Sequence, residues 1–374
     1  MAARYKYNMI DQESKNEELV EMSSRAYQFL REKMIEEAQV EFLRILEADE
    51  HNNYALVGLG DLERQRGDYH RAITYYQHCL EHHPENNYAL FGLAESYRGL
   101  RQYGRAVEVW EQYLKHDSEN VTVLTRVADA YRKIRSFERS RELYNMVLAI
   151  EDDNNYALIG MGHLHYDFKD YPNAMHYWQR MYEKSGESVD IRVLTSLGNC
   201  HRKMKTFDQG VKYFEAALQR EPDNFFALYG MADCYRGMLE PAKSLIYWQR
   251  ILANDPENKV ILTRIGDAYR ALGDLEAAEE HYRRALNVQF DTYAALGLAI
   301  LHRTRKDYPA AISALEHLIQ AEPENYRAVA ELAGCYEIQG KYAEALAVLA
   351  RYMQSSRIPV KAAQRYASDL KARM

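Results

Sequence analysis

One sequence pattern recurs along this chain about every 34 residues, and that period limits which folds the chain can adopt. In a clear copy that begins at Asn87, apolar or small residues recur three and four apart, as at Leu90, Leu93 and Ala94. A repeat of this length is typical of a solenoid, in which each unit packs mainly against its neighbours. The copies begin near Asn53, Asn87, Val121, Asn155, Ile191, Phe225, Lys259, Thr292 and Tyr326.

Each copy holds a small residue at its eighth position and another at its twentieth, such as Ala94 and Ala106. Small side chains let two helices approach closely, and the apolar residues around them give each helix a buried face. Short polar runs between the two halves, as at Gly67-Asp68 and Gly273-Asp274, predict a turn. One unit is therefore predicted to be a helical hairpin.

The pattern resembles that of the tetratricopeptide repeat (TPR) family. The resemblance implies an all-α, right-handed superhelical solenoid of about ten hairpins with a C-terminal capping helix. It also implies that the first helix of each hairpin lines a concave groove. The matching positions in the copy from Asn87 are Leu90, Leu93, Ala94, Tyr97, Tyr103, Ala106, Trp110 and Tyr113.

The pattern divides the chain into three parts. Residues 1–18 have mixed charge and no sustained period, so we expect a flexible tail. Residues 19–358 are the predicted TPR array, whose first unit starts near residue 19 and diverges as a terminal cap would. Residues 359–374 are predicted to form the capping helix, with Ala363 and Leu370 on one face.

Two irregularities interrupt the array. The run between Met181 and Ile191 adds about two residues, so we expect the pitch of the solenoid to change there. Alternate units also differ, because Trp110, Trp178 and Trp248 share one position, and the units that follow them read Val-Leu-Thr or Ile-Leu-Thr near their start where other units read Tyr-Ala-Leu or Phe-Ala-Leu. Duplication of a pair of units would produce this alternation without any functional cause.

Composition excludes several classes of function. The formal net charge is −7, which does not favour binding to nucleic acid. No apolar run is long enough to span a membrane and the first residues lack the apolar core of a secretory signal, so a cytoplasmic protein is expected. The cysteines stand where other units have Ala, Leu or Ser, which indicates small buried residues: Cys79, Cys200, Cys234 and Cys335.

No catalytic motif is present in the sequence. We find no glycine-rich phosphate loop, no nucleophile elbow and no acid–base pair, so we predict no enzymatic activity and no cofactor. His78 and His82 lie one helical turn apart, but no third ligand is evident, so no metal site is predicted.

The groove is predicted to carry a row of aromatic residues at the second position of the units and a row of arginines at the twelfth. Aligned arginines could bind carboxylates or phosphates of an extended partner, while the aromatic rings pack against its side chains. Alternatively, the arginines pair with acidic residues three positions earlier and in neighbouring units. The candidate partner-binding residues are Tyr54, Tyr88, Arg98, Arg132, Tyr156, Arg202, Phe226, Arg236, Arg270 and Tyr293.

Glycine recurs at the sixth position of several units, inside the first helix. Glycine in the middle of a helix costs about 1 kcal/mol relative to alanine, so something should need the space. We expect an aromatic ring from the adjoining unit to pack over it, and close approach of a ligand is the alternative. These glycines are Gly58, Gly92, Gly160, Gly230 and Gly297.

Two functional hypotheses follow. The first is a non-enzymatic scaffold that binds a segment of another protein, of acidic character if the arginines are available, in the concave groove. The second is a structural subunit that self-associates through its ends or its convex face. Binding of nucleic acid by the arginine row is disfavoured by the acidic net charge.

Overall fold

A computed structural model describes residues 18–356 and 360–373, and every regular element in these ranges is a helix. The described chain divides into two compact units. The boundary between them falls between Lys184 and Ser185, within the insertion noted in the sequence. The predicted tail lies outside the described residues, apart from residue 18, where the first helix begins. None of the described helices is long and apolar enough to cross a bilayer.

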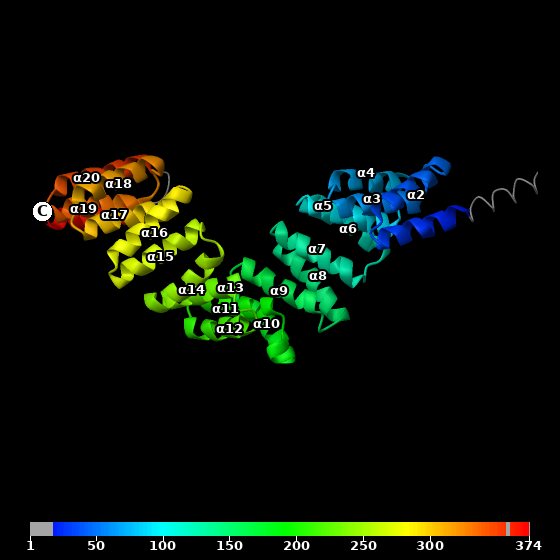
Figure 1. The fold of residues 1–374 in the computed structure, drawn as a ribbon, viewed down its shortest axis with the longest axis horizontal. Coiled ribbons are helices and arrows are strands. Elements are labelled where there is room, and N and C mark those ends of the chain that lie inside the picture. The colour runs from blue at the N-terminus through cyan, green and yellow to red at the C-terminus, as the bar shows by residue number, and fades with distance from the viewer. Residues whose placement is uncertain (1–17, 357–359, 374) are drawn as a thin grey trace, which may run out of the picture. The chain divides into compact units, whose positions relative to one another are not determined.

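Unit 1 is a series of antiparallel helical hairpins (Figure 1). Its first helix covers residues 18–31. The helices that follow are α2 (Ile35–Ala48), α3 (Asn53–Arg66), α4 (Tyr69–His82), α5 (Asn87–Gly99), α6 (Tyr103–His116), α7 (Val121–Lys133), α8 (Phe137–Ile150), α9 (Asn155–Asp167) and α10 (Tyr171–Ser185).

Unit 2 continues the pattern after a short 3₁₀ helix, η1 (Gly186–Ser188). The all-α solenoid of hairpins predicted from the sequence is thus confirmed. Its helices are α11 (Ile191–Lys203), α12 (Phe207–Arg220), α13 (Phe225–Gly237), α14 (Pro241–Asn254), α15 (Lys259–Leu272), α16 (Leu275–Val288), α17 (Thr292–Thr304), α18 (Tyr308–Ala321), α19 (Tyr326–Ile338), α20 (Tyr342–Ser355) and α21 (Lys361–Arg373).

Asparagine or aspartate caps the start of each first helix from α3 onward. In α5, for example, the Asn86 side chain accepts a hydrogen bond from the Ala89 backbone N–H at 3.0 Å. Such a cap satisfies one of the unpaired N–H groups at a helix start and stabilises it by about 1 kcal/mol. The predicted turns also form: Gly67 has φ 81°, a conformation that glycine adopts without steric cost, and Asp68 caps α4.

Aromatic rings from the second helices pack over the glycines of the first helices. A Cβ added to Gly92 would lie 2.3 Å from Cζ of Tyr76, and one added to Gly160 would lie equally close to Cζ of Tyr144. These distances leave no room for any side chain larger than hydrogen. The expectation that a ring of the adjoining unit needs the space is confirmed.

The helices at the two ends of the array bury apolar residues, as the sequence predicts. Phe42 of α2 is fully buried beside Ala26 of the first helix. In α21, Ala363 and Leu370 are fully buried against α20. Each end therefore keeps an apolar side of its neighbour out of water.

Candidate functional site

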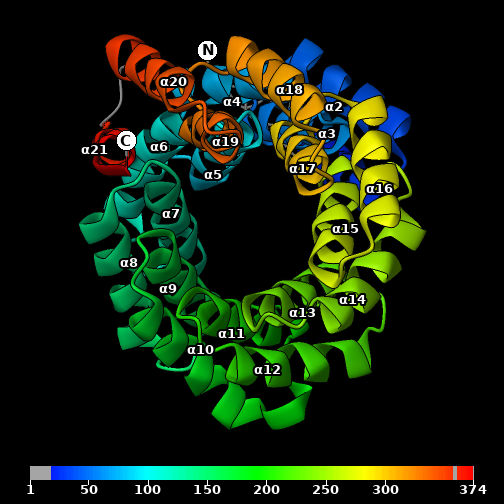
Figure 2. The ribbon, with the colours of Figure 1, turned by 90° about the vertical axis from the view of Figure 1, so that its left-hand side faces the viewer.

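The first helices of successive hairpins lie side by side and form one face of each unit, which we name the first-helix face (Figure 2). In unit 1, α3 packs against α5 and α7 against α9. In unit 2, α11 packs against α13 and α15 against α17. The second helices lie behind them, so side chains at the second position of each unit can reach the open side.

The predicted aromatic row lies exposed on the first-helix face. Single exposed apolar side chains are common on protein surfaces, but an aligned set of them is typical of an interaction surface. The five members are between 59 and 80% exposed: Tyr54, Tyr88, Tyr156, Phe226 and Tyr293.

Two pockets lie along the row in unit 1. The first, of about 700 Å³, is lined by Tyr54, Asn87 and Tyr88 among others. The second, of about 560 Å³, shares Asn87 and Tyr88 and adds Arg64 and Phe91. Since Tyr88 and Asn87 line both, the two pockets form one continuous candidate site.

Two polar atoms of this site have no hydrogen-bond partner among the described residues. They are Oδ1 of Asn87, an acceptor, and Nε of Arg64, a donor, and both atoms are buried. A buried polar atom without a partner costs about 1–3 kcal/mol. The sequence analysis missed both atoms, because nothing in the repeat pattern shows which side chains have spare hydrogen-bonding capacity.

A third pocket lies on the first-helix face of unit 2. It has a volume of about 710 Å³ and is lined by Tyr293 and Leu296 of α17 and Tyr326 and Arg327 of α19. Tyr293 thus stands beside a pocket as Tyr54 and Tyr88 do.

The arginine row is paired with acidic side chains in both units. In unit 1, Arg98 Nη2 lies 2.5 Å from Glu95 Oε2, within the same helix. Arg132 pairs with Asp129 at 2.7 Å and with Asp167 of the next hairpin at 2.5 Å, and its side chain is only 11% exposed. Both arginines therefore have strong local partners.

In unit 2, one carboxylate joins two arginines. Asp233 Oδ2 lies 2.6 Å from Arg202 Nη1 and Asp233 Oδ1 lies 2.6 Å from Arg236 Nη2. Burial by itself would raise the pKa of Asp233, but hydrogen bonds and charges of Arg236 and Arg202 lower it below its usual value. The carboxylate is therefore held in its charged form.

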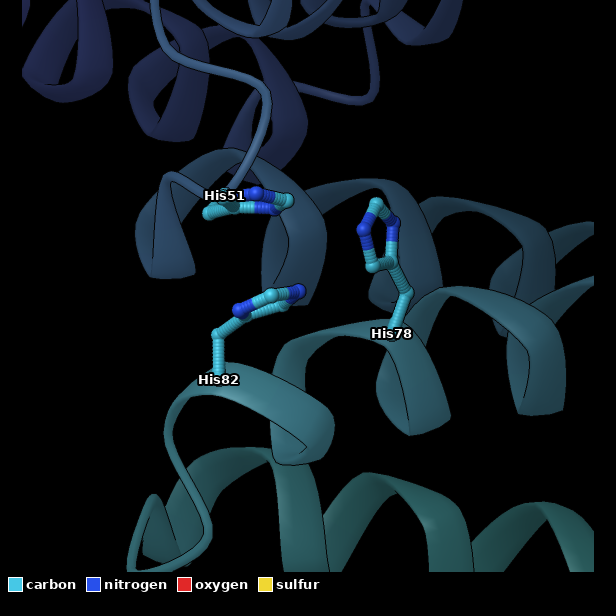
Figure 3. A group of neighbouring side chains, drawn as sticks. All are labelled: His51, His78 and His82. Carbon is cyan, nitrogen blue, oxygen red and sulfur yellow. The ribbon is translucent and has the colours of Figure 1, made fainter.

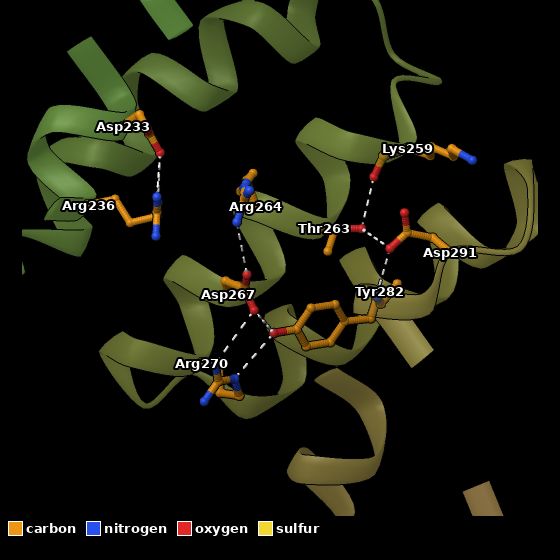
Figure 4. A network of polar contacts seen from close by, with 10 residues as sticks. Asp233, Arg236, Lys259, Thr263, Arg264, Asp267, Arg270, Tyr282 and Asp291 are labelled. Carbon is orange, nitrogen blue, oxygen red and sulfur yellow. Dashed lines mark hydrogen bonds and ion pairs between the residues drawn. The ribbon is translucent and has the colours of Figure 1, made fainter. Parts of the chain in front are cut away.

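Arg270 belongs to a wider polar network, drawn in Figure 4. It lies 3.6 Å from Asp267, and its Nε donates to the Tyr282 hydroxyl at 3.3 Å. That hydroxyl in turn donates to Asp267 at 2.8 Å. Tyr282 is the ring that packs over Gly297, so the network connects the first-helix face at α15 to the aromatic packing.

Two arginines of the row form their ion pairs across hairpins. Neither α11 nor α17 contains an acidic residue, so Arg202 and Arg303 instead pair with a carboxylate of the next hairpin, Asp233 and Glu331 respectively. The charge of the arginine row is thus largely compensated by carboxylates of the same chain. The aromatic row, by contrast, remains exposed to solvent.

The sequence analysis found no third ligand for His78 and His82, and the structure corrects this. His51, in the loop between α2 and α3, places its ring beside theirs. The signal was present in the sequence, two residues before the second unit, but only the hairpin geometry brings that loop to the end of α4.

Family models described as tetratricopeptide repeat match six segments of the chain. No curated protein sequence is significantly similar to it. The matched residues are 55–96, 91–156, 191–224, 226–258, 261–292 and 303–370.

Several solved structures are similar in fold. A tetratricopeptide repeat protein from Parabacteroides merdae is 15% identical over 73% of this chain and 94% of its own, with a TM-score of 0.41. Yeast Tom70 is 15% identical and covers 96% of each chain, with a TM-score of 0.43. PilW, a type IV pilus biogenesis factor, is 18% identical over 53% of this chain and 91% of its own, with a TM-score of 0.48.

Proposed function

Because this chain belongs to the tetratricopeptide repeat family, we propose that it is a non-enzymatic cytoplasmic scaffold that binds an extended segment of another protein on its first-helix face. The observation that carries the proposal is the exposed aromatic row beside two pockets, whose lining includes side chains with a polar atom that has no partner in the described part of the chain. The residues at its centre are Tyr54, Tyr88, Asn87 and Arg64.

An extended segment matches the chemistry of these pockets. Its backbone offers unpaired N–H and C=O groups, whereas a helix uses most of its own. Asn87 Oδ1 and Arg64 Nε are buried, so both side chains must turn toward the pocket to pair with the N–H and C=O groups of the segment. Its side chains would pack against the rings of Tyr54 and Tyr88, which are 59 and 80% exposed.

The partner's charge is expected to matter less than its apolar side chains. Arg98, Arg132 and Arg236 already have acidic partners in the chain, and displacing these would expose a charged group without compensation. We therefore place the main binding energy in the aromatic row and give the arginine row the role of holding neighbouring hairpins in register.

Selection from a library of random ten-residue peptides displayed on phage tests this function. We expect enriched peptides with aromatic or apolar residues at alternate positions, since alternate side chains of an extended chain point the same way. Binding of the enriched peptides, measured by fluorescence anisotropy, should weaken about 1,000-fold in Tyr54→Ala/Tyr88→Ala, because central tyrosines contribute about 2 kcal/mol each.

The matched control is Ile246→Ala, which removes an exposed apolar side chain from the second helix α14. It should leave peptide affinity unchanged. Peptides that bind the tyrosine double variant as tightly as the wild type would contradict the proposal. Absence of any enriched peptide, together with a mass that rises with protein concentration in light scattering, would favour self-association instead.

A further inference from the structure

Three histidines meet at the junction of the first two hairpins of unit 1 (Figure 3). His51 lies in the loop between α2 and α3, and His78 and His82 lie one turn apart near the end of α4. Their ligand nitrogens, one from each ring, all lie within 4.8 Å of one another. The cluster is independent of the first-helix face, since two of its members are on a second helix.

The rings of the cluster are already in contact. His51 and His82 are stacked, with centroids 3.6 Å apart, and His78 stands edge-on to both at 5.6 and 5.8 Å. Two nitrogens bound to one Zn²⁺ ion are each about 2.0–2.1 Å from it, so they lie no more than about 4.2 Å apart. His78 is half-buried and His82 exposed, so both side chains have room to turn, and binding an ion requires them to close the remaining difference.

The surroundings of His51 match those of a metal ligand. Its Nδ1 is buried and has no hydrogen-bond partner among the described residues. Its Nε2 lies 3.4 Å from the Glu50 carboxylate. Metal-binding histidines commonly turn their second ring nitrogen toward a carboxylate, which fixes the tautomer and orients the ring.

The backbone of the loop is also held in place. Nε2 of His83, which follows α4 directly, lies 2.9 Å from the backbone carbonyl oxygen of His51, so its N–H tautomer donates to that oxygen. This contact positions the His51 loop over α4 before any ion binds, and it reduces the ordering that metal binding would require.

We propose that His51, His78 and His82 form a binding site for a divalent transition metal ion that prefers imidazole, with Zn²⁺ as its probe. Neutral imidazole nitrogens suit Zn²⁺, Ni²⁺ and Cu²⁺ rather than Mg²⁺ or Ca²⁺. Three protein ligands leave a fourth position open. The bound ion joins the α2–α3 loop to α4 and so fastens the first two hairpins together.

Titration of the chelator-treated full chain with Zn²⁺ in a calorimeter tests the site. We expect one ion per chain in the wild type. His51→Gln, His78→Gln and His82→Gln should each weaken binding about 100-fold or more, since even loss of a partner outside the ligand set costs 10- to 100-fold. Zn²⁺ should also raise the thermal unfolding midpoint of the wild type but not of His82→Gln.

His317→Gln is the matched control. His317 occupies the same place in its unit as His78, on α18, but Ala321 stands one turn later where His82 would be. This variant should bind Zn²⁺ like the wild type. Circular dichroism of each variant checks the fold, and the exposed position of His82 makes His82→Gln safe in this respect.

Two results would overturn the proposal. One is wild-type affinity for Zn²⁺ no higher than that of a variant with all three histidines changed to glutamine. The other is unchanged affinity in folded His51→Gln, because it would leave only the pair on α4, which any exposed helix with histidines four apart can provide.

Discussion

Helices α5 and α7 occupy equivalent places in successive hairpins, yet their sixth residues differ completely. In α5 this residue is Gly92, and the ring of Tyr76 from α4 passes directly over it. In α7 it is Arg126, 46% exposed, which reaches back to Glu95 at 3.6 Å. At the place in the second helix where α4 has Tyr76, α6 has Trp110, which is fully buried.

This difference indicates that the alternation of units follows from how the second helix of one unit packs on the first helix of the next. A tyrosine or phenylalanine at this place in the second helix extends over the next first helix and requires glycine there. A tryptophan is followed by arginine or serine. The pairs of the first kind are Phe42–Gly58, Tyr76–Gly92, Tyr144–Gly160, Phe214–Gly230 and Tyr282–Gly297. Those of the second kind are Trp110–Arg126, Trp178–Ser196 and Trp248–Arg264.

The largest effect should come from filling the space under a ring. Gly92→Val should destabilise unit 1 by about 3 kcal/mol, because its Cβ would lie 2.3 Å from the Tyr76 ring and overpacking a core is costly. Arg126→Ala, at the same place in α7, should change stability by less than about 0.5 kcal/mol. Urea unfolding followed by circular dichroism measures both, and equal effects would break the distinction between the two types.

Asn199 of α11 and Asp233 of α13 both occupy the ninth position of their units, so they extend the comparison of the two types to this position. Both accept hydrogen bonds from Arg202, but only Asp233 carries a charge. Asp233→Asn should cost about 2 kcal/mol at pH 7, because it leaves Arg202 partly buried without a carboxylate, whereas Asn199→Ala should cost about 1 kcal/mol.

The same variant has a predictable pH dependence. The folded pKa of Asp233 is lowered, so its contribution is fully present above the ordinary value of about 3.9 and is lost as pH falls through the folded value. The difference in unfolding free energy between wild type and Asp233→Asn should therefore shrink below about pH 4. A difference that stays constant down to pH 2.5 would contradict the ion pair.

Tyr88→Ala should separate binding from stability. The side chain is 80% exposed, so its removal should change the free energy of unfolding by less than about 0.5 kcal/mol while peptide affinity falls about 30-fold. Thr122→Ala, at the second position of the alternate type, should be equally neutral for stability. A large loss of stability in Tyr88→Ala would mean that the ring belongs to the fold rather than to a binding face.

The smallest difference is expected between two cysteines. Cys200 and Cys234 share the tenth position in α11 and α13, which belong to the two types, and burial raises the pKa of each thiol to about 12. Neither should react with Ellman's reagent at pH 8 until the chain unfolds, because the thiolate is the reactive form. Rapid reaction of one thiol alone would show that the alternation extends into the core.

The sequence was sufficient to predict the fold because its separate local signals agree with one another. The period, the small residues at two fixed positions, the Asn86-type caps and the turns near Gly67 and Gly273 all specify helical hairpins through local contacts. In a solenoid each unit meets only its neighbours, so local pattern and tertiary packing carry the same information.

What the sequence by itself determined is therefore the all-α hairpin array, its repeat register and the aromatic row, all of which follow from spacing along the chain. Tertiary structure alone decided which polar groups have partners and which do not among the described residues. Arg202 pairs with Asp233 of the next hairpin, Asn87 Oδ1 has no partner in the described ranges, and His51 lies beside His78 and His82. These outcomes depend on side-chain distances of a few ångströms between segments about 30 residues apart, which no periodicity can specify.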